Sequence, residues 1–271
     1  MNIIGCGRVG RVLGRLFAQQ NGLLVQDVLT RSKASASDAV VFIGAGRACA
    51  DMAGLRVADI TLLGVPDDQI TATCAALAAS GLLNADSVVF HCSGALSSEA
   101  LSGARACGAA VASVHPVRSF ADAETVAQNF PGTFCGVEGD ARALQILQPA
   151  LLAIGAHPVL LDANAKTLYH AASVFACNYL TTIVDTALRA YNAAGIAPDL
   201  ARQMAQPLIT ETLVNIFKLG PEQALTGPIA RGDLATVAKQ QAAVAAWDST
   251  AGTLYEALAV ATKQLAQRRQ H

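Results

Sequence analysis

Charged and aromatic residues are scarce in this sequence. Charged residues make up 14% of the 271 positions, and 19 Lys and Arg are balanced by 20 Asp and Glu. Four tyrosines and one tryptophan offer few rings on which nucleic-acid bases could stack. Because a nucleic-acid-binding surface requires a basic face, this composition argues against nucleic acid and favours a small molecule as the partner.

Long uninterrupted apolar runs are also missing, although hydrophobic residues make up 53% of the chain. The most apolar stretch, residues 171–188, contains Asn178 and Asp185. These residues predict a buried helix of a soluble protein rather than a membrane span. A glycine motif begins at Gly5 and leaves no room for the basic and apolar regions of a signal peptide.

Cysteines at metal-binding or dithiol spacing are absent. The seven cysteines are odd in number and scattered, without any C-x-x-C pair. They predict reduced thiols and therefore a cytoplasmic protein. No cluster of His, Cys and carboxylates has the spacing of metal ligands, so we expect no metal.

What the first 160 residues do contain is an alternation of short β-branched segments with Ala- and Leu-rich segments, which is typical of a parallel sheet covered by helices. The expected strands are Met1–Ile4, Leu24–Leu29, Asp59–Leu63, Ser87–His91, Ala110–Val114, Thr133–Val137 and Pro158–Leu161. The expected helices are Arg8–Gln20, Asp67–Ala79, Ser97–Ala106 and Ala141–Ile154. The segment Ala39–Gly46 fits either another strand or a short helix ended by Gly44.

Strand-forming segments end near Leu161, and long helical segments broken by Gly and Pro follow. We therefore predict two domains: a doubly wound α/β domain over residues 1–162 and an all-α domain over residues 163–271. The second domain is rich in Ala and Leu and poor in charge, which predicts that part of it is buried against a second copy in a homodimer.

The glycine-rich segment 5–10, GCGRVG, follows the first expected strand and begins a helical pattern. In such a motif the first glycine makes a tight turn, the second lets the backbone approach a pyrophosphate, and the third allows close packing of helix and strand. The first N–H groups of the helix then face the phosphates. This context predicts a Rossmann-type dinucleotide site. The cofactor-binding residues expected here are Gly5, Gly7, Arg8, Val9 and Gly10.

Thr30-Arg31-Ser32 follows the second expected strand, where an NAD enzyme usually carries Asp or Glu for the ribose 2′-hydroxyl. A guanidinium and hydroxyl groups suit a 2′-phosphate instead, so Arg31 and Ser32 predict NADP(H) as the cofactor. A solvated surface charge is the alternative interpretation of Arg31. Asp27 stands too early in the strand to reach the ribose.

Polar residues follow three further expected strands, in the segments Gly64–Asp67, His91–Gly94 and His115–Pro116. Ligands bind outside the carboxyl ends of the strands in open α/β sheets, so these segments predict a cleft. The cofactor-binding residues expected from them are Val65, Pro66, Asp67, Ser93 and Gly94.

Together these motifs resemble DUF2520, a bacterial family of Rossmann-like proteins with a helical C-terminal domain, which is related to ketopantoate reductase and pyrroline-5-carboxylate reductase. The resemblance also includes the segments Tyr169–Ser173 and Leu225–Asp233. It implies the two-domain fold and an NADP-dependent oxidoreductase. A small carbonyl or imine is the expected substrate, with a 2-oxo acid such as ketopantoate as one candidate.

His170, Val174 and Asn178 have the spacing of one helix face. In the related dehydrogenases this helix carries a lysine followed four residues later by an asparagine. Here Asn178 fits, but Val174 stands at the lysine position. We predict His170, Asn178 and His115 as catalytic residues, with His170 or His115 as the proton donor.

Ser173 and Arg231 are the expected contacts to an anionic substrate in the cleft between the domains. A structural role is the alternative for His170, and an ion pair with Asp233 is the alternative for Arg231. The missing lysine also leaves a second function open, that of a non-catalytic NADP-binding sensor or interaction protein.

Overall fold

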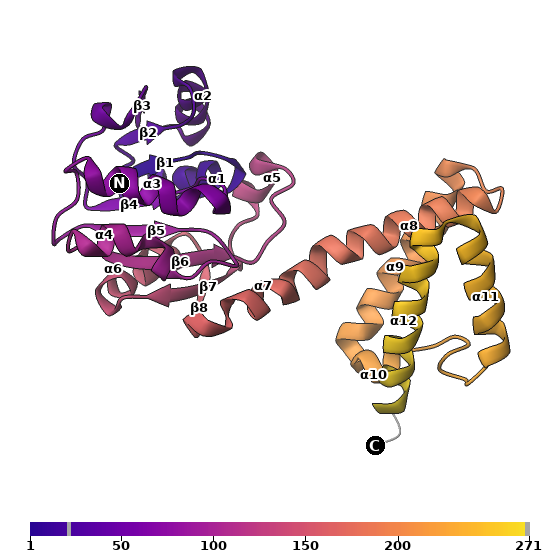
Figure 1. Cartoon of the computed structure of the whole chain (residues 1–271). Helices are drawn as coiled ribbons and strands as arrows, with labels where there is room; N and C mark the ends of the chain where they lie inside the picture. The colour runs from indigo at the N-terminus through magenta and orange to yellow at the C-terminus, as the bar shows by residue number, and fades with distance from the viewer. Residues whose placement is uncertain (21–22, 269–271) are drawn as a thin grey trace. The chain divides into compact units, whose positions relative to one another are not determined.

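The computed structural model describes residues 1–20 and 23–268 and divides the chain into two compact units, Met1–Cys177 and Asn178–His271 (Figure 1). The strands of the first unit are β1 Asn2–Ile4, β2 Asp27–Leu29, β3 Arg47–Cys49, β4 Ile60–Leu63, β5 Val88–His91, β6 Ala110–Pro116, β7 Phe134–Gly139 and β8 His157–Leu160. Its helices are α1 Arg8–Ala18, α2 Lys33–Ile43, α3 Asp67–Ala79, α4 Ser102–Ala106, α5 Ala123–Gln128, α6 Ala141–Ala153 and α7 Lys166–Val174.

The strands form one sheet in the order β3-β2-β1-β4-β5-β6-β7-β8. All neighbouring pairs are parallel except β6 and β7, which are antiparallel. The order 3-2-1-4-5-6 is that of the Rossmann fold, so the predicted fold class is confirmed. The chain changes direction across the sheet between β1 and β4, and a ligand crevice is expected outside the carboxyl ends of these two strands.

The short strand β3 is absent from the expected strands, because it comprises only three residues, Arg47–Cys49, and begins with an exposed arginine. The ambiguous segment before it is the end of helix α2. Gly44 ends this helix in the left-handed conformation with φ of 80°, as the helical alternative requires.

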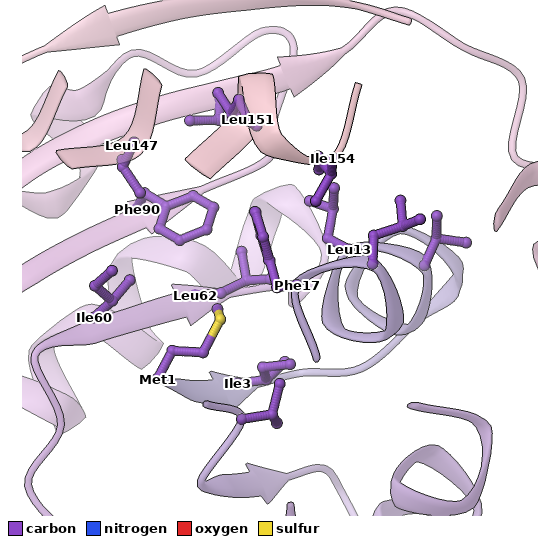
Figure 2. Close-up of a cluster of buried hydrophobic side chains, with 14 of the residues drawn as sticks. Met1, Ile3, Leu13, Phe17, Ile60, Leu62, Phe90, Leu147, Leu151 and Ile154 are labelled. Carbon is purple, nitrogen blue, oxygen red and sulfur yellow. The ribbon is translucent and has the colours of Figure 1, made fainter. Parts of the chain in front are cut away.

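Both faces of the sheet are apolar and covered by helices. Leu62 of β4 packs with Phe90 of β5 and Phe17 of α1 on one face (Figure 2). Leu63, the next residue of β4, belongs to the cluster on the other face with Ile70 of α3. Because successive strand side chains point to opposite faces, a strand buried on both sides reads as a continuous apolar run.

Asp27 of β2 is fully buried and lies away from the cleft, as expected. Its carboxylate accepts hydrogen bonds from Arg47 Nε at 2.9 Å and from Arg56 Nη2 at 2.9 Å. Burial raises the pKa of this carboxyl, but the hydrogen bonds of Arg56 and Arg47 outweigh burial and hold the pKa well below its usual value. Asp27, Arg47 and Arg56 therefore form an ionised network that connects β2 to β3.

The second unit contains α8 Leu180–Ala193, α9 Pro198–Leu219, α10 Pro221–Ala224, α11 Leu234–Trp247 and α12 Ser249–Arg268. Asp233 caps α11 by accepting a hydrogen bond from Thr236 N at 3.1 Å. Helices α11 and α12 approach closely, because a Cβ on Gly252 would lie 2.7 Å from Ala245 Cα. The predicted all-helical C-terminal part is confirmed.

The first unit extends beyond the boundary expected at residue 162, because α7 packs with the sheet. A π-helical turn, Phe175–Tyr179, then separates α7 from α8. A π turn holds more residues than an α turn, so it changes the helical spacing between Val174 and Asn178. The expected single face for His170, Val174 and Asn178 stays a prediction.

One helix among the described residues, Ala163–Ala193, passes the test of length and composition for crossing a membrane, with a mean hydropathy of 1.2. The most apolar part of this helix is not buried by the rest of the chain. The burial expected for residues 171–188 is therefore not found in the single chain. A single helix of this kind is weak support for a membrane span, since core helices of soluble proteins pass the same test.

The two glycines Gly64 and Gly7 differ in the space that surrounds them. A Cβ on Gly64 would lie 2.3 Å from Gly5 O, whereas a Cβ on Gly7 would meet nothing within 4 Å. We predict that Gly64→Ala lowers the free energy of unfolding by at least about 1–3 kcal/mol, because the backbone must shift. Gly7→Ala should change it by less than about 0.5 kcal/mol. Urea unfolding measures both, and equal stabilities of the two variants would contradict this packing.

Candidate functional site

A cleft of about 1210 Å³ opens at the carboxyl edge of the sheet, outside strands β1 and β4. Its size and position suit a dinucleotide. The lining comes from the glycine turn, the ends of β2, β4 and β5, and the start of α5. Of the expected cofactor residues, those that line the cleft are Gly5, Gly7, Arg8, Val9, Arg31, Val65, Pro66, Asp67 and Ser93. Gly10, Ser32 and Gly94 do not line it.

The glycine turn and the turn after β4 touch through their backbones. Gly5 has φ of 82°, and a side chain on it would overlap Val65 N at 2.6 Å. A Cβ on Gly10 would lie 2.9 Å from Gly5 O, so Gly10 packs the helix against the strand end rather than lining the cleft. The space beside Gly7 is open, and helix α1 begins directly after it without a side-chain cap. The first N–H groups of α1 are thus available to an anion.

The end of β2 contributes Thr30, Arg31 and Ser35 to the cleft. Arg31 is exposed, and no hydrogen bond or ion pair holds its guanidinium within residues 1–20 and 23–268. Ser32 instead caps α2, since its Oγ accepts a hydrogen bond from Ser35 N at 3.2 Å. This part of the cleft therefore offers a positive charge and hydroxyl groups at the expected ribose position.

The end of β5 is fixed by Ser93. Its Oγ donates to Asp67 Oδ2 at 2.6 Å and accepts from Ala95 N and Leu96 N. Ser93 N in turn donates to His91 Nδ1 at 3.1 Å. The other His91 nitrogen must then carry the proton, which it donates to Ser97 O at 3.1 Å. His91 is therefore a buried structural residue, and burial lowers its pKa to about 4.

Two imidazole rings converge beside Gly94. A Cβ on Gly94 would lie 2.2 Å from His170 Nδ1 and 2.8 Å from His115 Nε2, so only glycine fits here. The two rings meet edge to face, with centroids 5.3 Å apart. His170 Nδ1 is buried and has no hydrogen-bond partner in the described part of the chain. A buried nitrogen without a partner is costly, which indicates a position that a ligand completes.

His115 lies at the end of β6. Tyr169 of α7 orients its ring, because Tyr169 Oη lies 3.0 Å from His115 Nδ1. Burial, followed by the electrostatic effects of His170 and Lys166, lowers the pKa of His115 to about 4. His115 is therefore uncharged near neutral pH. With Nδ1 engaged by Tyr169, its Nε2 is the nitrogen that faces Gly94.

Lys166, the first residue of α7, is a site residue that the sequence did not reveal. It is 1% exposed, and its Nζ donates to Ser93 O at 3.0 Å and to Ser113 Oγ. Lys166 stands four residues before His170, so the two lie on one face of the same α-helix. This i, i+4 spacing is the signal in the sequence that points to Lys166, whereas the resemblance to the related dehydrogenases points to position 174.

Of the remaining predicted residues, one lies on α7 and two belong to the second unit. Ser173 is half-buried and is the second-last residue of α7. Asn178 opens the second unit, and Arg231 is exposed in the turn before α11 of the same unit. Their catalytic and substrate-binding roles stay predictions.

Family models identify the two parts of the chain. Residues 1–116 match the Rossmann-like domain, and residues 133–262 match DUF2520, a domain of unknown function. The chain combines these two domains. The resemblance seen in the sequence motifs is thus confirmed. The DUF2520 match begins just before β7 and therefore includes the last two strands together with the helices. No curated protein sequence matches the chain.

Solved structures share the fold over nearly the whole length. Protein TM1727 from Thermotoga maritima is 26% identical with a TM-score of 0.76, and the match covers 100% of this chain and 99% of that one. BF3122 from Bacteroides fragilis, named a candidate NADP oxidoreductase, is 18% identical with a TM-score of 0.79 and 97% coverage of both chains. A pyrroline carboxylate reductase from Plasmodium falciparum with NADP bound is 13% identical with a TM-score of 0.59, covering 98% and 97% of the two chains.

Proposed function

We propose that the protein is an NADP(H)-dependent oxidoreductase that reduces a small carbonyl or imine. The observation that carries this proposal is the unpartnered His170 Nδ1, which converges with His115 Nε2 on Gly94, the residue after Ser93, and Ser93 lines a dinucleotide-sized cleft. The names of the similar structures, one of which holds NADP, support an oxidoreductase of this kind.

The residues of the cleft fit the cofactor. Gly5 and Gly7 leave the backbone of the turn open to a pyrophosphate, and the start of α1 offers N–H groups to its charge. Arg31 and Thr30 would hold the 2′-phosphate, because a guanidinium binds phosphate oxygens in a fixed, charged geometry. The bound cofactor supplies a hydride to the carbon of the substrate carbonyl or imine.

The protein then has to supply one proton and an orientation. His170 and His115 present nitrogens from two elements, so one can donate to the substrate oxygen or nitrogen while the other holds it. The hydrogen bond to Tyr169 keeps the ring of His115 in place during this step. An oxo acid, with ketopantoate as a candidate, and a cyclic imine are the substrate classes that need this chemistry. Asn178 is proposed as a further catalytic residue, and Ser173 and Arg231 are proposed as substrate contacts.

We also propose a cytoplasmic homodimer. Large apolar side chains of α9 are exposed to solvent in the single chain, with exposed fractions of 57% for Val214 and 88% for Phe217. Burying such a face in a second copy removes apolar surface from water. Light scattering at micromolar concentration should give twice the mass of the chain. A monomer under these conditions would contradict the proposal.

Arg31 provides the test of cofactor choice. We predict that Arg31→Ala weakens NADPH binding by about 10–100-fold, because a charge-assisted contact to the 2′-phosphate is lost. NADH affinity should change by less than about twofold, since NADH has no such phosphate. Calorimetric titration measures both, with Arg202→Ala, an exposed arginine of α9, as the matched control. Equal loss of both affinities, or no loss, would argue against the 2′-phosphate site.

Turnover provides the test of catalysis. Wild-type protein should oxidise NADPH with at least one member of a panel of 2-oxo acids, ketopantoate and cyclic imines. We predict that His170→Ala lowers kcat by about 10²–10⁴-fold with NADPH affinity unchanged, because the proton donor is removed. His157→Ala on β8, an exposed histidine, is the control. NADPH binding without any turnover would favour the sensor or interaction protein instead.

A further inference from the structure

Lys166 is buried without an ion pair. Its side chain is 1% exposed, and within residues 1–20 and 23–268 no carboxylate lies at salt-bridge distance from its Nζ. Lysine is almost never fully buried, and burying an ammonium costs several kcal/mol unless other groups offset that cost. The acceptors of this ammonium are Ser93 O and Ser113 Oγ. The burial of this ammonium is thus a cost to folding that a functional role would explain.

We propose that Lys166 is a positioning residue of the reductase site, whose buried ammonium fixes the Ser93–Gly94 peptide against which His115 and His170 act. The role in turnover rests on the proposed function. The effect on the Ser93–Gly94 peptide depends on the hydrogen bonds alone.

The hydrogen bonds determine the orientation of one peptide group. Ser93 O accepts from Lys166 Nζ at 3.0 Å and from Ser113 Oγ at 3.3 Å. The peptide is trans, so the Gly94 N–H points to the side opposite this carbonyl. That N–H donates no hydrogen bond in the described part of the chain. By holding the carbonyl, Lys166 leaves a backbone donor directed away from itself, on the glycine whose Cα faces the two imidazole nitrogens.

The charge of Lys166 also acts on the neighbouring histidine. The positive charge of Lys166 contributes to the low pKa of His115, after burial and His170. The other charged or titratable groups that interact with Lys166 are Glu138 of β7, Asp67 of α3, the Cys92 thiol and His91 of β5. Glu138 is engaged by Ser98, whose N and Oγ each donate to it at 2.8 Å. Burial lowers the pKa of Lys166, and Glu138 is the largest effect that opposes this by favouring the ammonium. The ammonium itself donates to the Ser93 carbonyl and acts on His115.

The test replaces Lys166 with Met, which keeps much of the length and removes the charge, and with Arg, which keeps the charge. Lys263→Met, at an exposed position of α12, is the control. In full-length Lys166→Met, the amides of Ala95 and Leu96 should exchange with solvent at least about tenfold faster than in wild type, because the turn is no longer tied down. The midpoint of the His115 titration, followed by NMR, should rise in Lys166→Met and stay low in Lys166→Arg.

Unchanged amide exchange, or an unchanged His115 midpoint in Lys166→Met, overturns the proposal. If Lys166→Met does not fold, Lys166→Gln is measured in the same way. In the turnover assay, kcat should fall by at least about tenfold while the Kd for NADPH stays within about twofold, since only the reacting geometry is disturbed. A wild-type protein that neither binds NADPH nor turns over defeats the proposed function, while exchange and titration still decide the role of Lys166.

Discussion

The contact between two backbone turns, one after β1 and one after β4, is the constraint on which the rest of the structure depends. Gly5 and Gly64 approach so closely that neither position has room for a Cβ. This contact lies where the strand order changes direction, so it fixes the floor of the cleft. Because the floor is made of backbone, the cleft can bring a phosphate close to helix α1. The adjoining strand ends then place their side chains around one opening.

Desolvation shapes the second part of the site. The ends of β5 and β6 and the start of α7 enclose His115, His170 and Lys166, whose nitrogens lie close to one turn of backbone. Burial keeps His115 uncharged, so this imidazole acts as a hydrogen-bonding group rather than as a cation. Hydrogen bonds fix two members of the cluster, His115 through Tyr169 and Lys166 through Ser113. These contacts fix the orientation of the side chains, which is what the proposed catalysis requires.

Features encoded within one short segment could be predicted from the sequence. The glycine motif, the main strands and the long helices follow from local patterns, and the cleft follows from the rule for parallel strand ends. Strand β3 was missed because three residues carry too little pattern. The π-helical turn after Val174 has no simple signal in the sequence. Lys166 was missed because its partner Ser93 lies 73 residues away, and only the fold brings the two together.

The most direct test of the account is a titration of isotope-labelled protein with NADPH, followed through its backbone amide resonances. We expect saturable shifts at Gly7 and Ser93, which line the cleft, and at Gly94 next to Ser93, with lesser changes at Gly132, a loop glycine remote from the lining in sequence. Resonances of Gly7 and Gly94 that stay in place at millimolar NADPH, or shifts confined to the second unit, would contradict the central claim that this cleft holds the cofactor beside the paired histidines.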